Sequence, residues 1–115
     1  MRFGVDRAER RHDVVLSVQG ELDIATVPVL RQAVDDALEA LEGDGRPRRL
    51  YVDLTATAFI DSTGCRELAR AAKTAGPLGI AVEVVAPAAN RKVRRIVDFM
   101  QFGDLLPLHE QVPAP

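Results

Sequence analysis

Two adjacent hydroxyls, Ser62 and Thr63, lie between the carboxylate of Asp61 and Gly64, where an apolar stretch gives way to a helical pattern. A Ser or Thr at the start of a helix can accept a hydrogen bond from a free backbone N–H group, which stabilises the helix by about 1 kcal/mol. The residues alone leave two roles open: a helix cap at Ser62 or Thr63, and a switch residue at Ser62.

The elements that position these hydroxyls follow from the hydrophobic pattern on either side of them. Residues 50–54 are dense in β-forming side chains and apolar at nearly every position, which predicts a strand in the middle of a sheet. Residues 55–60 are interpreted as a connection. After Gly64 the apolar side chains recur at helical spacing until a glycine and a proline end the pattern. We therefore predict a helix from about Ser62 to Gly76.

The first part of the chain predicts a hairpin followed by a helix. Residues 3–5 and 14–18 alternate apolar and polar side chains, with a charged turn at residues 7–11 between them. The alternation breaks at residues 20–23. Thr26 is interpreted as the cap of an amphipathic helix. The apolar face of that helix comprises Val27, Leu30, Val34, Leu38 and Leu41.

The later part of the chain predicts a further turn, strand and helix. Residues 43–47 have the composition of a turn. Residues 80–86 are apolar on both faces of a strand except at Glu83. A third helix follows, with Asn90 as its cap and Gly103 at its end.

The end of the chain completes the predicted fold. Residues 105–108 indicate a short edge strand, because a proline there lacks the N–H group that an inner strand needs. Residues 111–115 are expected to form a frayed C-terminal tail. Strands that alternate with helices indicate an α/β fold. We predict a single domain over residues 1–110, with a mixed sheet of four to five strands covered by three or more helices.

Composition limits the possible functions. The chain has 115 residues, with 15 basic and 17 acidic side chains and one cysteine. This length suits one domain, and the near balance of charge gives no general attraction for nucleic acid or an anionic membrane. No stretch approaches the roughly 20 apolar residues that cross a membrane. A single cysteine excludes an internal disulfide and indicates a reducing compartment, so a soluble cytoplasmic protein is expected.

Enzyme and cofactor functions have little support in the sequence. Asp61 to Gly64 is similar to the Asp-Thr-Gly of aspartic proteases, but the glycine comes one position late, and that chemistry needs two carboxylates. A serine hydrolase needs a base beside its serine, whereas His12 and His109 are expected at exposed positions elsewhere. No phosphate-binding glycine loop or metal-ligand cluster is recognisable. We therefore expect no enzyme activity, cofactor, metal ion or small-molecule substrate.

Two blocks of sequence resemble STAS domains, and most closely the bacterial anti-sigma factor antagonists, over nearly the whole chain. The first is Gly-Glu-Leu-Asp-Ile-Ala-Thr at residues 20–26. The second runs from residues 50–54 to Phe-Ile-Asp-Ser-Thr-Gly at residues 59–64. In that family, an anti-sigma factor that is itself a serine kinase phosphorylates the serine aligned with Ser62. The unphosphorylated antagonist binds this kinase and frees the sigma factor, and a serine phosphatase resets the phosphorylated form, which does not bind.

The resemblance implies roles for individual residues. Ser62 would be the phosphate acceptor, with Thr63 as a second candidate. The partner-binding residues would be Asp23, Thr26, Asp61, Ser62, Thr63, Gly64 and Arg66. Asp53 matches a family position at the end of the central strand. The resemblance also leaves open a non-switching adaptor in a stressosome-like or transporter assembly, in which Ser62 would only cap the helix.

The sequence departs from the antagonist pattern after Gly64. Antagonists usually continue with apolar or small residues, whereas here two charged residues, Arg66 and Glu67, follow Cys65. Arg66 is expected to share an exposed helix face with Arg70 and Lys73, either as a solvated surface or as a determinant of partner specificity. Cys65 is expected to pack in the core, although the start of a helix can lower the pKa of a thiol.

Overall fold

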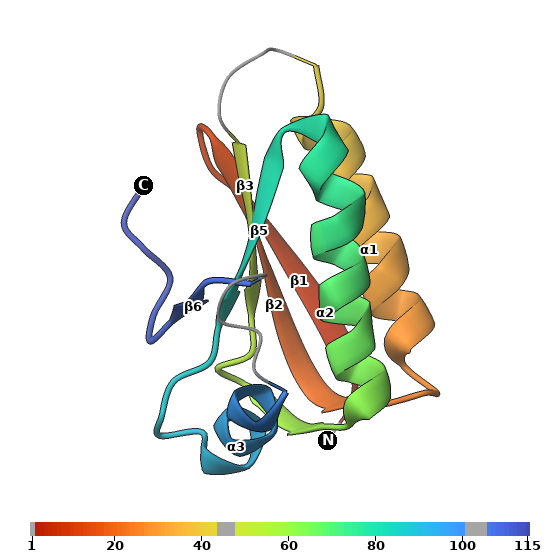
Figure 1. Cartoon of the computed structure of the whole chain (residues 1–115), viewed down its shortest axis with the longest axis vertical. Coiled ribbons are helices and arrows are strands. Elements are labelled where there is room, and N and C mark those ends of the chain that lie inside the picture. The colour runs from red at the N-terminus through yellow and green to blue at the C-terminus, as the bar shows by residue number, and fades with distance from the viewer. Residues whose placement is uncertain (1, 44–47, 101–105) are drawn as a thin grey trace.

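The structure is a computed structural model that describes residues 2–43, 48–100 and 106–115. Its elements, in chain order, are β1 (Gly4–Glu9), β2 (Asp13–Leu22), α1 (Val27–Leu41), β3 (Arg48–Asp53), β4 (Thr57–Ile60), α2 (Ser62–Ala75), a 3₁₀ turn (Gly76–Leu78), β5 (Ile80–Val85), α3 (Arg91–Phe99) and β6 (Leu108–His109). Figure 1 shows one layer of strands with two long helices packed against it. Residues 44–47 of the predicted turn, the predicted helix end at Gly103, and Leu105 of the predicted edge strand lie outside the described residues.

β3 lies at the centre of the sheet, as its apolar sequence predicts. The strand order is β1-β2-β3-β5-β6. β2, β3, β5 and β6 run parallel, whereas β1 pairs antiparallel with β2. The sixth strand, β4, pairs with the last residues of β2. The predicted mixed α/β fold is confirmed, but residues 55–60 contain a strand instead of a simple connection. β4 was not predicted because it lacks the alternation of buried and exposed residues that is typical of a strand. Thr57 and Ile60 are buried, and the two residues between them are exposed.

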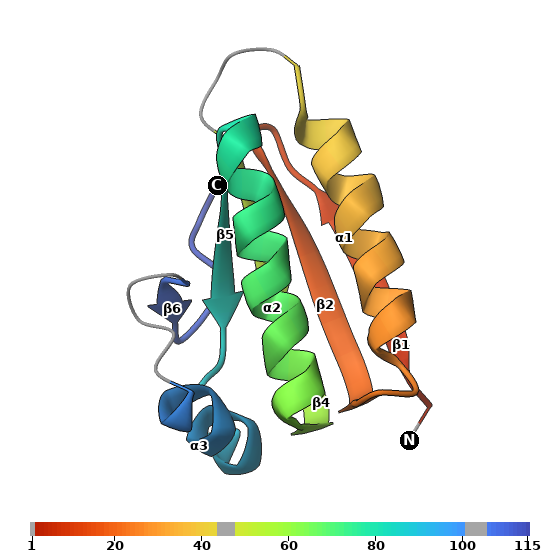
Figure 2. The same ribbon diagram turned by 45° about the vertical axis from the view of Figure 1, so that its right-hand side comes forward.

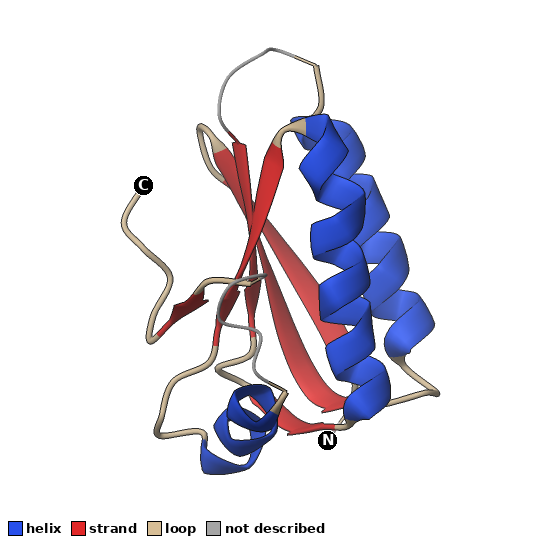
Figure 3. Cartoon of the chain, viewed as in Figure 1, coloured by secondary structure: helices blue, strands red, loops and turns tan. Residues whose placement is uncertain are grey.

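α1 and α2 cover the same face of the sheet, and Figures 2 and 3 show them side by side. The five apolar residues predicted to face the core from α1 are all buried. They belong to one hydrophobic core with apolar side chains of the sheet, including Leu16, Leu50 and Val82. Because burial of this apolar surface is the main source of stability, the two helices are fixed firmly to the sheet. That fixed arrangement positions the start of α2.

The first two strands are longer than the sequence predicts. β1 continues to Glu9, so most of the residues expected in a charged turn belong to a strand. This is possible because β1 is at the edge of the sheet, where charged side chains remain in water. β2 continues through Gly20, which has φ +90°, and the pairing register with β4 shifts between Gly20 and Glu21. Glycine adopts this backbone conformation without strain, so β2 can extend to pair with β4.

α3 lies at the end of the sheet where α2 begins, as Figures 1 and 2 show. Asn90 is the N-cap residue of α3, as predicted, but its side chain makes no capping bond. Its amide instead donates to the carbonyl oxygens of Leu54 and Thr57, at 3.0 and 2.8 Å. Asn90 therefore joins the start of α3 to the loop between β3 and β4.

The C-terminal segment packs on the other face of the sheet, away from α1 and α2 (Figure 1). His109 Nε2 lies 2.5 Å from a carboxylate oxygen of Glu83, and the His109 and Tyr51 rings meet edge to face with centroids 5.9 Å apart. Arg10 donates to the carbonyl oxygen of Pro113 at 2.9 Å and stacks over Tyr51. The prediction of an exposed His109 is therefore wrong, and the tail expected to fray is held at Pro113.

Candidate functional site

Asp61 is the N-cap of α2. Its backbone is extended (φ −113°, ψ −173°), and its Oδ1 accepts a hydrogen bond from the backbone N–H of Gly64 at 3.0 Å. The cap predicted at Ser62 or Thr63 is therefore wrong. Asp is among the best N-cap residues, and its negative charge interacts favourably with the positive end of the helix dipole.

This cap leaves the Ser62 hydroxyl available. Ser62 is the first residue of α2 and is exposed, whereas Thr63 is half-buried. Across the ranges that the structure describes, the Ser62 side chain has no hydrogen-bond or ion-pair partner. A hydroxyl that is neither buried nor needed as a cap is chemically free to be modified.

The loop between β2 and α1 lies beside the start of α2. The backbone N–H of Asp61 donates to the carbonyl oxygen of Leu22 at 3.3 Å, which joins the two segments. Inside the loop, Thr26 Oγ1 accepts from the backbone N–H of Asp23 at 3.0 Å and donates to the carbonyl oxygen of Glu21 at 2.7 Å. Thr26 precedes α1 as predicted, but its hydroxyl closes the loop and makes no side-chain capping bond.

The residues predicted for the site thus converge at one end of the molecule. Asp23 and Thr26 come from the β2–α1 loop, and residues 61–64 form the start of α2 beside it (Figure 2). Gly64 permits this closeness, since a Cβ atom there would lie only 3.0 Å from the carbonyl oxygen of Leu22. Asp53, in contrast, accepts from the backbone N–H of Thr55 at 3.0 Å, and so serves the turn after β3.

A shallow groove of about 440 Å³ follows the exposed face of α2. Its lining residues are Arg66, Ala69, Arg70, Lys73 and Thr74. Arg66, Arg70 and Lys73 therefore share a face, as the helical spacing predicts. Arg70 is held by ion pairs to Glu67 and Asp35, at 2.6 and 3.1 Å. Arg66 and Lys73 have no ion-pair partner among the residues that the structure describes. The groove thus carries two cations that are available for an incoming anion.

Glu67 is a buried carboxylate, whereas its sequence context predicted only a charge in the first turns of the helix. Its side chain is 0 % exposed and bonds to Arg31 of α1 at 2.7 Å and to Arg70 at 2.6 Å. Helical spacing offered the signal that could have found it, because Glu67 falls on the same stripe of α2 as the buried Gly64, Leu68 and Ala71. The Glu67 carboxylate ties α2 to α1 beneath the groove.

Glu67→Gln is expected to lower the free energy of unfolding by about 1 to 2 kcal/mol. The amide keeps the shape of the side chain, but it loses the charge and one acceptor oxygen between two guanidinium groups. The loss stays moderate because Arg31 is 54 % exposed and solvent screens it. Urea denaturation of Glu67→Gln beside Glu39→Gln, at an exposed position of α1, measures the difference. Equal stabilities of the two variants would show that the buried pairing contributes nothing.

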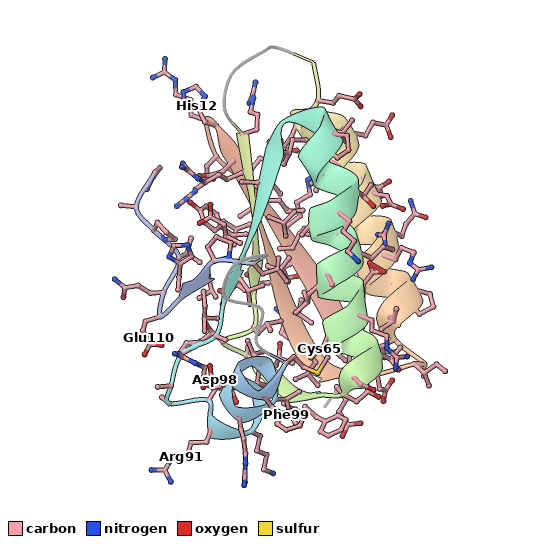
Figure 4. All side chains as sticks on the ribbon, in the orientation of Figure 1. His12, Cys65, Arg91, Asp98, Phe99 and Glu110 are labelled. Carbon is pink, nitrogen blue, oxygen red and sulfur yellow. The ribbon has the colours of Figure 1, made fainter. Side chains whose placement is uncertain are left out.

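Cys65 is fully buried in the first turns of α2 (Figure 4). Burial, with a smaller contribution from the charge of Asp61, raises the pKa of its thiol to about 11. The expected packing role is confirmed, since burial outweighs any lowering by the helix start. Because ionisation of the buried thiol is disfavoured, the fold is expected to lose stability as pH rises above the ordinary thiol pKa of 9.0 towards 11.

Cys65 is therefore expected to react at least about a hundredfold more slowly with an aromatic disulfide reagent at pH 8 in the native protein than in 8 M urea. The raised pKa alone lowers the thiolate fraction by roughly this factor, and burial blocks access as well. A Cys65→Ala, Thr74→Cys variant, with its thiol at an exposed position, provides the control and should react equally fast in both solvents. Rapid labelling of native Cys65 would mean that the first turn of α2 opens readily.

The large apolar side chains that are exposed around the same end of the molecule include one from the β2–α1 loop, one from β4 and one from α3. Ile24 in the β2–α1 loop is 77 % exposed, Phe59 in β4 is 43 % exposed, and Phe99 at the end of α3 is 80 % exposed. Figure 4 shows Phe99 projecting outward from α3. None of the three was predicted from the sequence as an exposed apolar residue. Exposed aromatic and aliphatic side chains of this kind are typical of the core of a protein interface.

Within residues 2–43, 48–100 and 106–115, no three His, Cys, Asp or Glu side chains are grouped so that they could hold a metal ion. None of the helices in those ranges combines the length and apolar character that a membrane span requires.

These features define a small α/β domain that presents a hydroxyl and apolar side chains on one surface. The family model of the STAS domain matches residues 5–114, and the chain belongs to this family. Among solved structures it is similar to an anti-sigma factor antagonist from Mycobacterium paratuberculosis, with 26 % identity, a TM-score of 0.81, and coverage of 96 % of this chain and 88 % of the other. The recognition of the STAS fold from the two sequence blocks is therefore confirmed.

The same fold occurs in SpoIIAA. The anti-sigma factor antagonist SpoIIAA in its unphosphorylated form matches with 18 % identity and a TM-score of 0.70, over 96 % of this chain and 90 % of SpoIIAA. The phosphorylated form of this Bacillus cell fate determinant matches with 18 % identity and a TM-score of 0.64, over 96 % and 93 % of the two chains. No curated protein sequence matches this chain significantly.

Proposed function

We propose that this protein is an anti-sigma factor antagonist that is switched by phosphorylation of Ser62. In its unphosphorylated state it binds a serine-kinase anti-sigma factor in the cytoplasm and so frees a sigma factor for transcription. Phosphorylation by the bound kinase releases it, and a serine phosphatase restores binding. The protein acts as a binding module and not as an enzyme. The observation that supports this most directly is the exposed Ser62 hydroxyl, which is not needed as a cap because Asp61 caps α2.

The surface around Ser62 has the chemistry of a docking site. Its polar part is formed by the β2–α1 loop, with Asp23 and Thr26, and by the start of α2. Its apolar part is formed by Ile24, Phe59 and Phe99. Binding affinity generally depends on a few such apolar anchors surrounded by polar contacts. A partner that buries these side chains would cover the Ser62 hydroxyl, so a phosphate there would lie inside the interface.

The release mechanism requires no unfolding of the domain. A phosphate at the start of a helix is electrostatically favourable for the helix itself, because the dipole has its positive end there. The unfavourable effect falls on the partner, which would have to bury or approach a doubly charged group. Steric exclusion and local repulsion are then sufficient to separate the two proteins.

Incubating the protein with its cognate kinase and ATP, followed by mapping of the phosphorylated residue by mass spectrometry, tests the proposal. We expect one phosphate at Ser62, none in Ser62→Ala, and unchanged modification in Thr63→Val, which preserves the shape of the half-buried Thr63. Modification of Thr63 alone would overturn the assignment of the acceptor. A confirmed kinase partner that binds the protein without phosphorylating it would instead favour a non-switching adaptor.

A further inference from the structure

Arg66 is an exposed cation in the first turns of α2. It lines the groove on α2 and, in the part of the chain that the structure describes, pairs with no carboxylate. On its own helix, the residues three and four positions away on either side are Thr63, Ser62, Ala69 and Arg70, and none of them is a carboxylate. Positions at this spacing are the neighbours that meet on a helix surface, so the nearest side chains are hydroxyls, a methyl group and a second cation.

The other basic residues of the groove differ from Arg66 in this respect. Arg70 already has Glu67 on its own helix and Asp35 on α1 as partners. Lys73 is unpaired among the described residues, but it lies eleven positions beyond Ser62, about three helical turns away. Arg66 alone combines an unpaired guanidinium group with a position one turn from Ser62.

We propose that Arg66 binds the phosphate of phosphorylated Ser62, so that the modified protein holds its own phosphate against the first turn of α2. This inference rests on the proposed function, because it assigns a positioning residue to the phosphorylated state of the same site. Phosphorylation would supply the missing anion four residues before Arg66. A guanidinium group can donate two parallel hydrogen bonds to phosphate oxygens.

The direction of the helix favours this contact. Side chains of an α-helix lean towards its N-terminus, so the Arg66 side chain leans over the turn that contains Ser62. An anion placed four residues before a cation is also the more stable order along a helix. The pairing has a further role here, because the carboxylate of Asp61, one residue before Ser62, repels the phosphate. Arg66 offsets that repulsion from the other side.

A consequence for regulation follows from this pairing. In the unphosphorylated protein, Arg66 lines the groove and is available to a docked partner. In the phosphorylated protein, the same guanidinium group is engaged by the phosphate. Modification of one hydroxyl therefore changes the surface at two places, one turn apart on α2.

The test is a double-mutant cycle on protein that carries genetically encoded phosphoserine at position 62, so that no kinase is needed. The unfolding equilibrium of four proteins is measured in urea: the unphosphorylated and phosphorylated forms, each with Arg66 and with Arg66→Gln. We expect a coupling of about fivefold in the unfolding equilibrium constant between phosphate and Arg66. The matched control is Lys73→Gln, which removes the same charge from the same face and should show a coupling near onefold.

Equal effects of Arg66→Gln on the phosphorylated and unphosphorylated proteins would overturn the pairing. Equal couplings for Arg66 and Lys73 would also overturn it, because they would indicate a general charge effect. Arg66→Lys should recover part of the coupling, since the charge remains but the two-pronged geometry is lost. If the coupling is present but the kinase does not modify Ser62, the pairing stands and the proposed function fails.

Discussion

Phosphorylation of Ser62 is expected to weaken binding to the serine-kinase anti-sigma factor by more than about a hundredfold, which corresponds to roughly 2.7 kcal/mol. One added charge that meets a partner carboxylate at about 6 Å is repelled by nearly 3 kcal/mol at an effective dielectric constant of about 20, and a phosphate carries about twice that charge. Solvent ions reduce these values at the rim of an interface but less in its interior. The phosphate would lie in the interior, between the β2–α1 loop and α3.

Two substitutions separate charge from shape in this prediction. Ser62→Ala should bind as tightly as the natural protein, because removing the hydroxyl removes no hydrogen bond within the described residues. Ser62→Asp adds one charge and should weaken binding by about tenfold to a hundredfold. Gln111→Glu adds the same charge in the C-terminal segment on the other side of the sheet and should change affinity less than about twofold.

Isothermal titration calorimetry with the purified kinase measures all three variants against the natural protein. Equal affinities of Ser62→Ala and Ser62→Asp would remove the electrostatic mechanism. A large loss in Ser62→Ala would mean that the hydroxyl itself makes an essential contact, and phosphorylation would then act by removing that contact.

Gly64→Ala is expected to lower the free energy of unfolding by about 3 kcal/mol. The new Cβ atom would lie 2.8 Å from Ile60 Cγ1, 2.9 Å from Leu22 Cγ and 3.0 Å from the Leu22 carbonyl oxygen. Two of these neighbours are buried side chains and the third is backbone, so the methyl group can be accommodated only if α2 moves away from the ends of β2 and β4. That movement would strain the hydrogen bond from the Asp61 N–H group to the Leu22 carbonyl oxygen. It would also shift the position of the Ser62 hydroxyl.

Gly76→Ala provides the matched control. Gly76 is at the other end of α2 and has helical dihedral angles (φ −50°, ψ −54°); apart from its two neighbours in the chain, no described residue would lie within 4 Å of a Cβ atom there. Its replacement should change the stability by less than about 1 kcal/mol, because the gain from restricting the unfolded chain is offset by Pro77, whose ring disfavours helical angles at a preceding residue that has a Cβ atom. Thermal denaturation of the two variants compares them directly. Similar stabilities would mean that the contact of α2 with β2 and β4 is loose enough to absorb a methyl group.

The position of the elements was largely predictable from the sequence because hydrophobic periodicity is a local property. The five apolar residues of α1 are buried as their spacing predicts, and α2 begins at Ser62. The two motif blocks identified the STAS family without any knowledge of contacts. They also nominated Ser62, whose exposure the structure supports.

Contacts between segments that are distant in the chain could not be predicted from the sequence. β4 is only four residues long and exists because it pairs with the bent end of β2. In the sequence, Glu67 is only one of several charges in α2. Its pairing is visible only in the fold, which places Arg31, 36 residues earlier in the chain, against it. Asparagine is a common helix-capping residue, but the side-chain amide of Asn90 donates to the carbonyl oxygens of Leu54 and Thr57, more than 30 residues away in the chain.

The capping of α2 shows most clearly which features the sequence determines and which depend on the tertiary structure. Sequence alone determined that a helix begins near two hydroxyls, Ser62 and Thr63, and that one of them belongs to a family motif. Only the tertiary structure decided that the cap is Asp61 and neither hydroxyl, because the choice depends on the backbone dihedral angles. Those angles are held by the backbone hydrogen bond from Asp61 to Leu22, which fixes residue 61 at the end of β2. By assigning the cap to Asp61, the fold leaves Ser62 exposed and chemically available.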